Sequence, residues 1–314
     1  MARLRLPTLG IVGLVLAACG PGTASLAPTL APATQTPTHA AVATPAPTED
    51  ACATDNVQTV TAGKLTIATD NPAFPPYFEG REGGNVEPWD PEWGDPTTGK
   101  GFESATAYAI ATQLGFEEDQ VTWIQTGFNN SFAPGAKDFD IFINQVTFKP
   151  ERAENADLSA GYYFGNQTVV VMADSEFADA TTITELKEAE LGAQVGTTSL
   201  TTIEDIIDTT PDAAVYNSTD DAIEAMTNGQ IDGIVVDLPT AFFITNVQIE
   251  GGAIVGQIGE AAGATPEHFS LVLELDSPLT ACVDAAITAL TDDSTMADLV
   301  AEWLPDASVP ELQP

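Results

Sequence analysis

Residues 139–152 read FDIFINQVTFKPER, and the interpretation of the whole chain starts from this stretch. The apolar run 139–143 predicts a buried strand, and the polar residues after it predict that the strand breaks into a turn. A strand whose carboxyl end opens into amides, a hydroxyl and an arginine is typical of a small-ligand crevice in an α/β sheet. The chain has only four arginines. The planar fork of Arg152 could hold a carboxylate at two points, although a surface arginine paired with an acid is the alternative.

The composition is strongly acidic, with 46 Asp and Glu residues against 9 Lys and Arg residues and a formal net charge of −37. Nucleic acid is therefore not expected as a partner, because phosphate binding needs clustered cations. The length of 314 residues allows one large domain or two modest ones. The sequence holds no HExxH, no CxxC pair and no phosphate-binding GxxxxGK[ST] loop, and His39 and His268 are its two histidines. These features favour binding over catalysis, so we expect no enzyme, metal or cofactor.

The N-terminal region has the pattern of an exported protein. Residues 1–18 combine a positive start with an apolar run that is too short for a permanent membrane span. The sequence Leu16-Ala17-Ala18-Cys19 resembles the lipobox of bacterial lipoproteins, which implies a lipid anchor on Cys19 and a place on the outer face of the cell membrane. An ordinary signal peptide with a coincidental cysteine is the alternative. Residues 19–51 are rich in Pro, Thr and Ala and predict a disordered tether.

From residue 52 onward, predicted strands alternate with predicted helices, which indicates an α/β fold with mainly parallel sheets. The expected strands are 64–69, 121–125, 139–143, 167–172, 191–195, 213–216, 231–236 and 269–275. The expected helices are 102–114, 200–208, 219–227, a helix starting at Pro239, 278–290 and 296–303. Residues 80–101 are rich in Gly, Pro and acids and read as a long surface loop.

Two further local patterns bear on the fold and the site. With Cys19 lipidated, Cys52 and Cys282 remain, and two thiols in an exported chain favour a disulfide; two buried thiols are the alternative. Residues 196–199 read GTTS between a strand and a helix. Such a helix start exposes N–H groups that can bind a carboxylate or phosphate, although a plain helix cap would explain the same residues.

These motifs together resemble the polar amino-acid solute-binding proteins of bacterial ABC importers. The resemblance covers about residues 63–304 and rests on seven motifs in order: KLTIATD with its aromatic and proline loop, GFE at 101–103, FDIFINQVTFKPER, Tyr162-Tyr163, LGAQVGTTS, QIDGIVVD and MADLVAEWL. It implies a two-lobed type II periplasmic-binding-protein fold, with the ligand cleft between lobes joined by two crossover segments. Lobe 1 is expected at 52–165 plus 269–310, and lobe 2 at 166–268.

The resemblance also implies roles for individual residues. Arg152 is expected to bind the α-carboxylate of an amino acid, and Asp237 is expected to bind the α-ammonium. The other implied ligand-binding residues are Asp70, Phe74, Asn144, Gln145, Thr147, Thr197 and Thr198. A buried zwitterion needs both of its charges matched, because its desolvation is otherwise not repaid.

The chain departs from the family pattern in three places. One extra residue separates Asp70 from Phe74, Lys149 stands where a threonine is common, and residues 80–100 are longer than usual. The expected protein is a monomeric lipoprotein that closes on a polar or cationic amino acid and delivers it to ABC permease subunits. The alternatives are a dehydratase-like enzyme acting on a small carboxylate, or a ligand-sensing or partner-binding lipoprotein.

Overall fold

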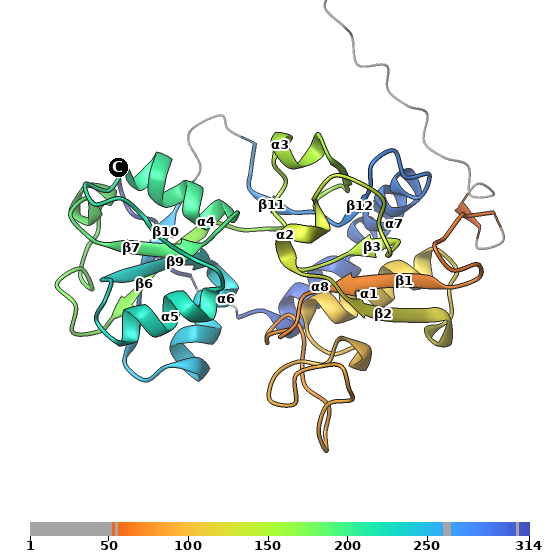
Figure 1. Ribbon diagram of the computed structural model, residues 1–314, viewed down its shortest axis with the longest axis horizontal. Coiled ribbons are helices and arrows are strands. Elements are labelled where there is room, and N and C mark those ends of the chain that lie inside the picture. The colour runs from red at the N-terminus through yellow and green to blue at the C-terminus, as the bar shows by residue number, and fades with distance from the viewer. Residues whose placement is uncertain (1–51, 54–55, 260–264, 306–307) are drawn as a thin grey trace, which may run out of the picture. The chain divides into compact units, whose positions relative to one another are not determined.

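The computed structural model describes residues 52–53, 56–259, 265–305 and 308–314. The expected signal peptide, the expected lipidation site Cys19 and the expected tether lie outside the described residues. Within the described part, no helix is both long and apolar enough to cross a membrane. Two five-stranded sheets form the framework, and helices pack against them (Figure 1). We call the part built on each sheet the first and the second lobe.

The first lobe is built on a sheet with strand order β2-β1-β3-β12-β4. These strands are β1 (Leu65–Thr69), β2 (Val121–Gln125), β3 (Ile141–Phe142), β4 (Ala156–Leu158) and β12 (Val272–Glu274). One face packs against α1 (Phe102–Gln113), α7 (Thr280–Asp292) and α8 (Thr295–Trp303). Leu65 and Ile67 point into this core, whereas Ala68, the residue after Ile67, joins the apolar cluster on the opposite face. This is the alternation that a strand buried on both faces requires.

The second lobe is built on a sheet with strand order β10-β6-β9-β7-β8. These strands are β6 (Gln167–Met172), β7 (Leu191–Gln194), β8 (Ala214–Tyr216), β9 (Gly233–Asp237) and β10 (Gly252–Ile258). The helices of this lobe include α4 (Thr198–Thr201), which continues into η5 (Thr202–Ile207), α5 (Thr219–Thr227), and α6 (Leu238–Phe243), which continues into η6 (Ile244–Gln248). Ile203 and Ile207 pack on one face of the sheet, and Ile223 and Met226 pack on the other.

Two short strands, β5 (Tyr163–Phe164) and β11 (His268–Phe269), pair antiparallel where the chain crosses between the lobes. The C-terminal residues pack back against the second lobe. The backbone of Gln257 on β10 donates to Pro310 O (2.9 Å) and accepts from Leu312 N (2.8 Å), and Leu312 is 6% exposed in the core of that lobe. The segment 269–310 that was expected in lobe 1 therefore ends at a residue whose backbone contacts the second lobe.

The structure corrects four expectations about the elements. Both sheets are mixed rather than mainly parallel: in the first sheet β12 runs antiparallel to β3 and β4, and in the second sheet β6 enters from the crossover and runs antiparallel to β9 and β10. Of the strand expected at 139–143, only β3 (Ile141–Phe142) forms, and the strand expected at 269–275 is divided into β11 and β12. The helix expected from residue 200 begins at Thr198. Strand β10 was not predicted, because the glycines at its start and within it, Gly252 and Gly256, conceal its apolar pattern.

The disulfide expected from the cysteine count is present between Cys52 and Cys282, with a Cα–Cα distance of 5.4 Å. It links the start of the described chain to the first turn of α7 across a sequence separation of 230 residues. Cys282 is buried in the core of the first lobe. The disulfide therefore fixes the entry of the chain to the helical face of this lobe.

Candidate functional site

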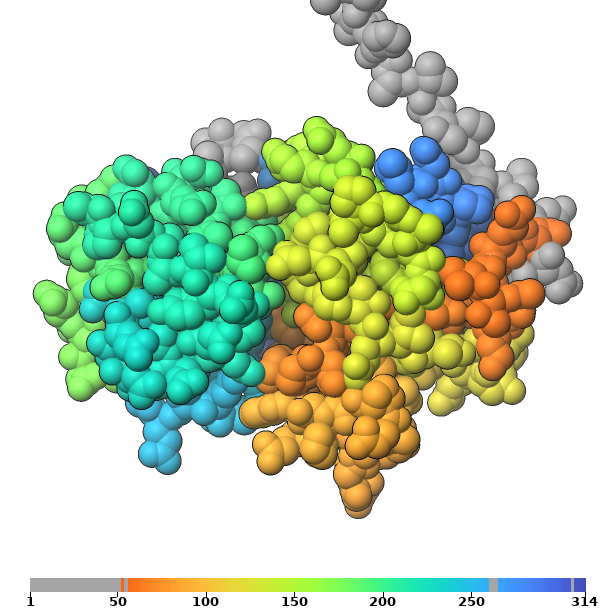
Figure 2. Space-filling model, in the orientation of Figure 1, coloured from red at the N-terminus to blue at the C-terminus, as the bar shows by residue number. Residues whose placement is uncertain are grey.

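The strands β1, β3 and β9 end at one cavity of about 230 Å³ lined by residues of both lobes. All nine residues that the resemblance singles out line it: Asp70, Phe74, Asn144, Gln145, Thr147, Arg152, Thr197, Thr198 and Asp237. They come from segments up to 167 residues apart in the sequence, and the carboxyl ends of the strands bring them together. The cavity lies at the boundary where the two lobes meet (Figure 2).

Arg152 lies in α3 (Pro150–Ala153), the short helix that follows the turn after β3. Its guanidinium donates from Nη1 to Thr147 O and from Nη2 to Gly196 O, the second bond crossing to the other lobe at 2.8 Å. The rings of Phe128 and Phe132 lie 5.5 and 4.7 Å from the guanidinium carbon. Burial lowers the pKa of Arg152 to about 10, so the side chain remains charged at neutral pH. Two N–H bonds are used in this way, which leaves three donors for a ligand.

Asp237 ends β9 and precedes α6, which starts with Leu238 and Pro239. Its Oδ1 accepts a hydrogen bond from Gln167 Nε2 at 2.8 Å. Burial, together with the nearby carboxylates of Glu267 and Glu103, raises the pKa of Asp237 to about 8, although Gln167 and Arg152 act in the opposite direction. A cation brought next to this carboxyl would favour its ionised form.

A polar cluster joins the two lobes behind the cavity. Thr147 Oγ1 donates to Glu267 Oε1 at 3.0 Å, and it lies 3.3 Å from Thr198 Oγ1 in the second lobe. Gln167 Nε2 is within hydrogen-bond distance of Glu267 Oε1 (2.8 Å) and Thr198 Oγ1 (3.2 Å). Neither Gln167 nor Glu267 was expected in the site from the sequence. Gln167 is the first residue of β6 and Glu267 directly precedes β11, both where the chain crosses between the lobes, and no local pattern there marks a polar residue as part of a site.

The turn before Arg152 is fixed by a second buried acid, Glu103 in the first turn of α1. Gln145 has a left-handed φ of 47° and donates from its backbone N to Glu103 Oε1 (2.7 Å) and from Nε2 to Oε2 (2.5 Å). Tyr162 donates to the same carboxyl at 2.5 Å. Burial raises the pKa of Glu103 to about 7, although these three bonds oppose the rise. The amide of Gln145 thus bonds to the first lobe, while Gln145 and Asn144 both line the cavity.

Asp70 supports the cavity wall through both carboxylate oxygens. Oδ1 accepts from Asn71 N (2.8 Å), and Oδ2 accepts from Phe128 N (3.0 Å) at the start of α2 (Phe128–Ser131). The carboxylate therefore holds the Phe128 ring that packs on Arg152. Phe74, after the proline of the same loop, faces Phe243 of α6 with ring centroids 6.4 Å apart.

The GTTS turn leads from β7 into α4. Thr197 caps α4, since its Oγ1 accepts from Leu200 N (3.2 Å) and donates to Gln194 O (2.7 Å). The plain-cap alternative thus describes the Thr197 side chain, while Thr198 Oγ1 takes part in the polar cluster. Gly196 has a φ of +82°, and a Cβ there would collide with the Asn129 amide of the first lobe. The turn needs this glycine to approach the other lobe.

The two lobes are in direct contact around the cavity. Besides the bond from Arg152, Lys149 Nζ donates to Thr201 Oγ1 at 2.6 Å and Tyr77 Oη lies 3.1 Å from Thr240 Oγ1. Lys149 is the residue that departs from the family pattern, and its ammonium bridges the lobes. The described residues contain no group of three or more His, Cys, Asp or Glu side chains arranged to hold a metal ion.

The sequence also matches a family model. The model of the bacterial extracellular solute-binding proteins, family 3, matches residues 83–306. The chain belongs to this family. This family 3 solute-binding protein is 23% identical over 260 residues to the arginine-binding extracellular protein ArtP of Bacillus subtilis (strain 168), a match that covers 81% of this chain and 91% of ArtP.

Solved structures agree with the family assignment. An ancestral arginine-binding protein bound to arginine superposes with a TM-score of 0.60 at 21% identity, covering 77% of this chain and 98% of that chain. The ancestral amino acid-binding protein AncCDT-1, a precursor of cyclohexadienyl dehydratase, superposes with a TM-score of 0.59 at 21% identity. The match covers 77% of this chain and 95% of AncCDT-1. The two-lobed type II periplasmic-binding-protein fold expected from the sequence is confirmed. At these identities the superpositions establish the fold alone.

Proposed function

We propose that this solute-binding protein captures an amino acid between its two lobes and delivers it to the permease subunits of an ABC transporter. The observation that carries the proposal is that one cavity holds Arg152 from the first lobe and Asp237 from the second. An amino acid offers one carboxylate and one ammonium, and only an arrangement with both partners compensates the desolvation of each charge. The cavity of about 230 Å³ is suited to a small solute.

The charges around the cavity support a cationic or neutral polar amino acid as the ligand. Asp70 and Asp220 line the cavity in addition to Asp237, and Arg152 is the one arginine among the lining residues. The names of ArtP and of the ancestral arginine-binding protein point in the same direction. Phe74 and Phe243 would provide apolar walls for the stem of the ligand side chain.

Closure follows from the division of the site between the lobes. The bonds from Arg152 to Gly196 and from Lys149 to Thr201 form only when the lobes meet. A ligand that contacts both lobes binds the closed arrangement more tightly than the open one and shifts the population toward it. The permease would then recognise the closed form. The lipobox at Cys19 supports an anchor that holds a single chain on the outer face of the membrane near the permease.

Removing the guanidinium tests the proposal. In isothermal titration with the twenty standard amino acids, the wild-type protein should bind at least one of them. Arg152→Ala should weaken that binding by about 10-fold or more, since a hydrogen bond to a charged group contributes about 1.5–3 kcal/mol. Lys187→Ala is the matched control, because Lys187 forms an exposed ion pair with Asp208 away from the cavity. Equal affinity in wild type and Arg152→Ala would refute the role of the arginine.

An enzyme on the same fold is the second candidate, and the precursor of a dehydratase among the structural relatives favours it. An enzyme would need a protonated acid positioned over the bound carboxylate, and the raised pKa of Asp237 supplies one candidate. Mass spectrometry of the solute after prolonged incubation separates the two functions. An unchanged solute supports transport, whereas a dehydrated product would support the enzyme.

A further inference from the structure

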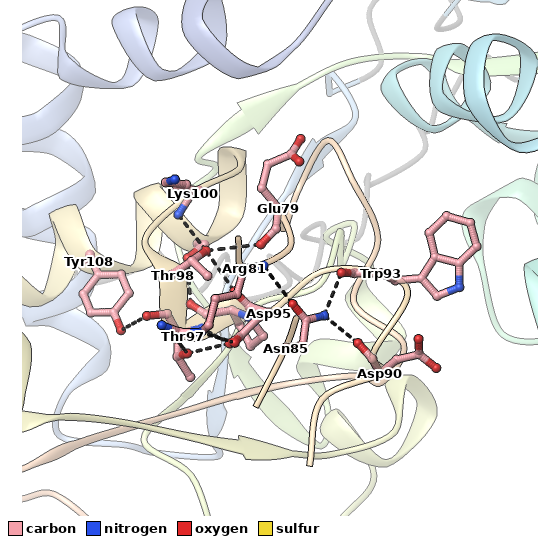
Figure 3. A network of polar contacts seen from close by, with 12 residues as sticks. Glu79, Arg81, Asn85, Asp90, Trp93, Asp95, Thr97, Thr98, Lys100 and Tyr108 are labelled. Atoms are coloured by element: carbon pink, nitrogen blue, oxygen red, sulfur yellow. Dashed lines mark hydrogen bonds and ion pairs between the residues drawn. The ribbon is translucent and has the colours of Figure 1, made fainter. Parts of the chain in front are cut away.

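The long loop between β1 and α1 is anchored firmly to the first lobe. At its base, Arg81 Nε donates to the buried Asp95 at 3.0 Å, and Arg81 Nη2 donates to Thr97 Oγ1 at 2.7 Å. Asp95 also accepts from Thr97 N at 3.0 Å, so it caps the turn that follows (Figure 3). Because Asp95 is fully buried and its carboxylate receives several donors, the base of the loop is fixed in position.

A second set of bonds fixes the backbone next to Trp93. Asn85 accepts from Arg81 N (2.8 Å) and donates from Nδ2 to Trp93 O (2.7 Å) and Asp90 O (2.5 Å). On the other side, Gly94 N donates to Ala73 O at 2.6 Å, in the segment that carries Phe74. Figure 3 shows the indole of Trp93 pointing away from this network.

The same loop is attached to the wall of the cavity. Asp90 N donates to Asn71 Oδ1 at 3.1 Å, and Asn71 Nδ2 donates to Pro88 O at 3.2 Å. Gln125 Nε2 at the end of β2 donates to the same carbonyl at 2.7 Å. Asn71 lines the cavity, so the loop and the cavity wall form one unit.

Trp93 lies against one aromatic residue from each lobe. Its ring centroid is 5.3 Å from that of Phe74 and 5.8 Å from that of Phe243, the latter in an edge-on arrangement at 80°. Phe74 and Phe243 both line the cavity and are themselves 6.4 Å apart. The three rings therefore form one cluster that spans the boundary between the lobes, with the indole packed against the two rings that line the cavity. Edge-on pairs at these separations are favourable beyond the area that they bury.

We propose that Trp93 is a closure-dependent positioning residue, an aromatic latch that the long loop carries to the cleft. The latch rests on the proposed function. The contact with Phe74 lies within the first lobe and persists when the lobes separate, whereas the contact with Phe243 exists only when they meet. The latch therefore stabilises the closed form and slows the release of the solute, and it sets the positions of the two rings that contact the solute side chain.

The test is a double-mutant cycle on Trp93→Ala and Phe243→Ala with L-arginine, or with whichever standard amino acid raises the melting temperature most. Removing one ring pair should weaken binding by roughly 2- to 12-fold, mainly through faster dissociation in stopped-flow measurements. Because both variants break the same pair, their combined effect should be smaller than the product of the single effects. Val86→Ala, at an exposed position of the same loop, is the control and should bind as the wild type does.

Small-angle scattering without ligand gives an independent measure of the latch. Trp93→Ala should shift the protein toward the open form and raise its radius of gyration, while Val86→Ala should not. Suppose that the wild type binds an amino acid. If Trp93→Ala then leaves affinity and dissociation rate unchanged, or if the effects of Trp93→Ala and Phe243→Ala on affinity multiply fully in the double variant, the latch is overturned and the proposed function stands. If the wild type binds no amino acid, the proposed function fails, and scattering decides the latch: identical curves for wild type and Trp93→Ala overturn it.

Discussion

The pKa of Asp237 leads to a prediction about the pH dependence of binding. The pKa of this buried carboxyl is about 8 when the lobes are closed without a ligand, so about nine in ten closed molecules carry it protonated at pH 7. The α-ammonium of a ligand needs the ionised carboxylate, and binding must therefore displace a proton. The displacement costs about 1.4 kcal/mol at pH 7, since one pKa unit corresponds to about that energy. Affinity should consequently rise with pH as the carboxyl ionises.

The magnitude follows from the fraction of ionised Asp237. This fraction increases from about 1% at pH 6 to about 50% at pH 8 for a pKa of about 8, which predicts an affinity gain of roughly 50-fold over this range. The sign is fixed: a raised acid pKa means that the free protein binds a proton that the complex releases. Isothermal titration at pH 7 in two buffers of different ionisation enthalpy should detect release of about 0.9 proton per ligand.

Two variants separate Asp237 from the other buried acid. Asp237→Asn should bind weakly and show little pH dependence between pH 6 and 8, because the titrating group is gone. Glu103→Gln should keep the dependence, since Glu103 bonds to Gln145 and Tyr162 and is not among the residues that line the cavity. A wild-type affinity that stays constant from pH 6 to 8, or an equal slope in Asp237→Asn, would show that this carboxyl does not bind the ammonium.

Two predictions concern stability. Cys282→Ser removes a cross-link between residues 230 positions apart, and loop-closure entropy sets an upper guide of about 5 kcal/mol for the loss in unfolding free energy; urea unfolding measures it, and an unchanged midpoint would contradict the entropic argument. Leu312→Ala should destabilise the protein by about 2–4 kcal/mol, because Leu312 is 6% exposed in the core of the second lobe. Gln313→Ala is the control for the same tail, and equal melting temperatures for both variants would mean that the tail does not hold this core.

Local sequence patterns predicted most of the elements, and the exceptions share a cause. The continuous apolar run at β6 correctly indicated a strand buried on both faces, but burial on both faces carries no information on direction. Direction is set by the crossover from the first lobe, which brings β6 in antiparallel to β9 and β10. The packing of Leu312 in the second lobe could not be predicted either. A single apolar residue in a short tail has no periodic pattern that would indicate its contact.

The sequence by itself determined the α/β class and the cysteine pair, because apolar periods, turn residues and cysteine number are local features of the chain. The two lobes and nine of the residues around the cavity came from the resemblance of its ordered motifs to a known family. Only the tertiary structure decided how those residues are used. It placed Glu267 and Gln167 against Thr147 and Thr198 at the crossovers, and it brought Trp93 to Phe243 across 150 positions. Such contacts depend on how the two lobes, each with its own core, pack against each other. The free energy of that packing depends on residues far apart in the chain, so no single stretch of sequence predicts it.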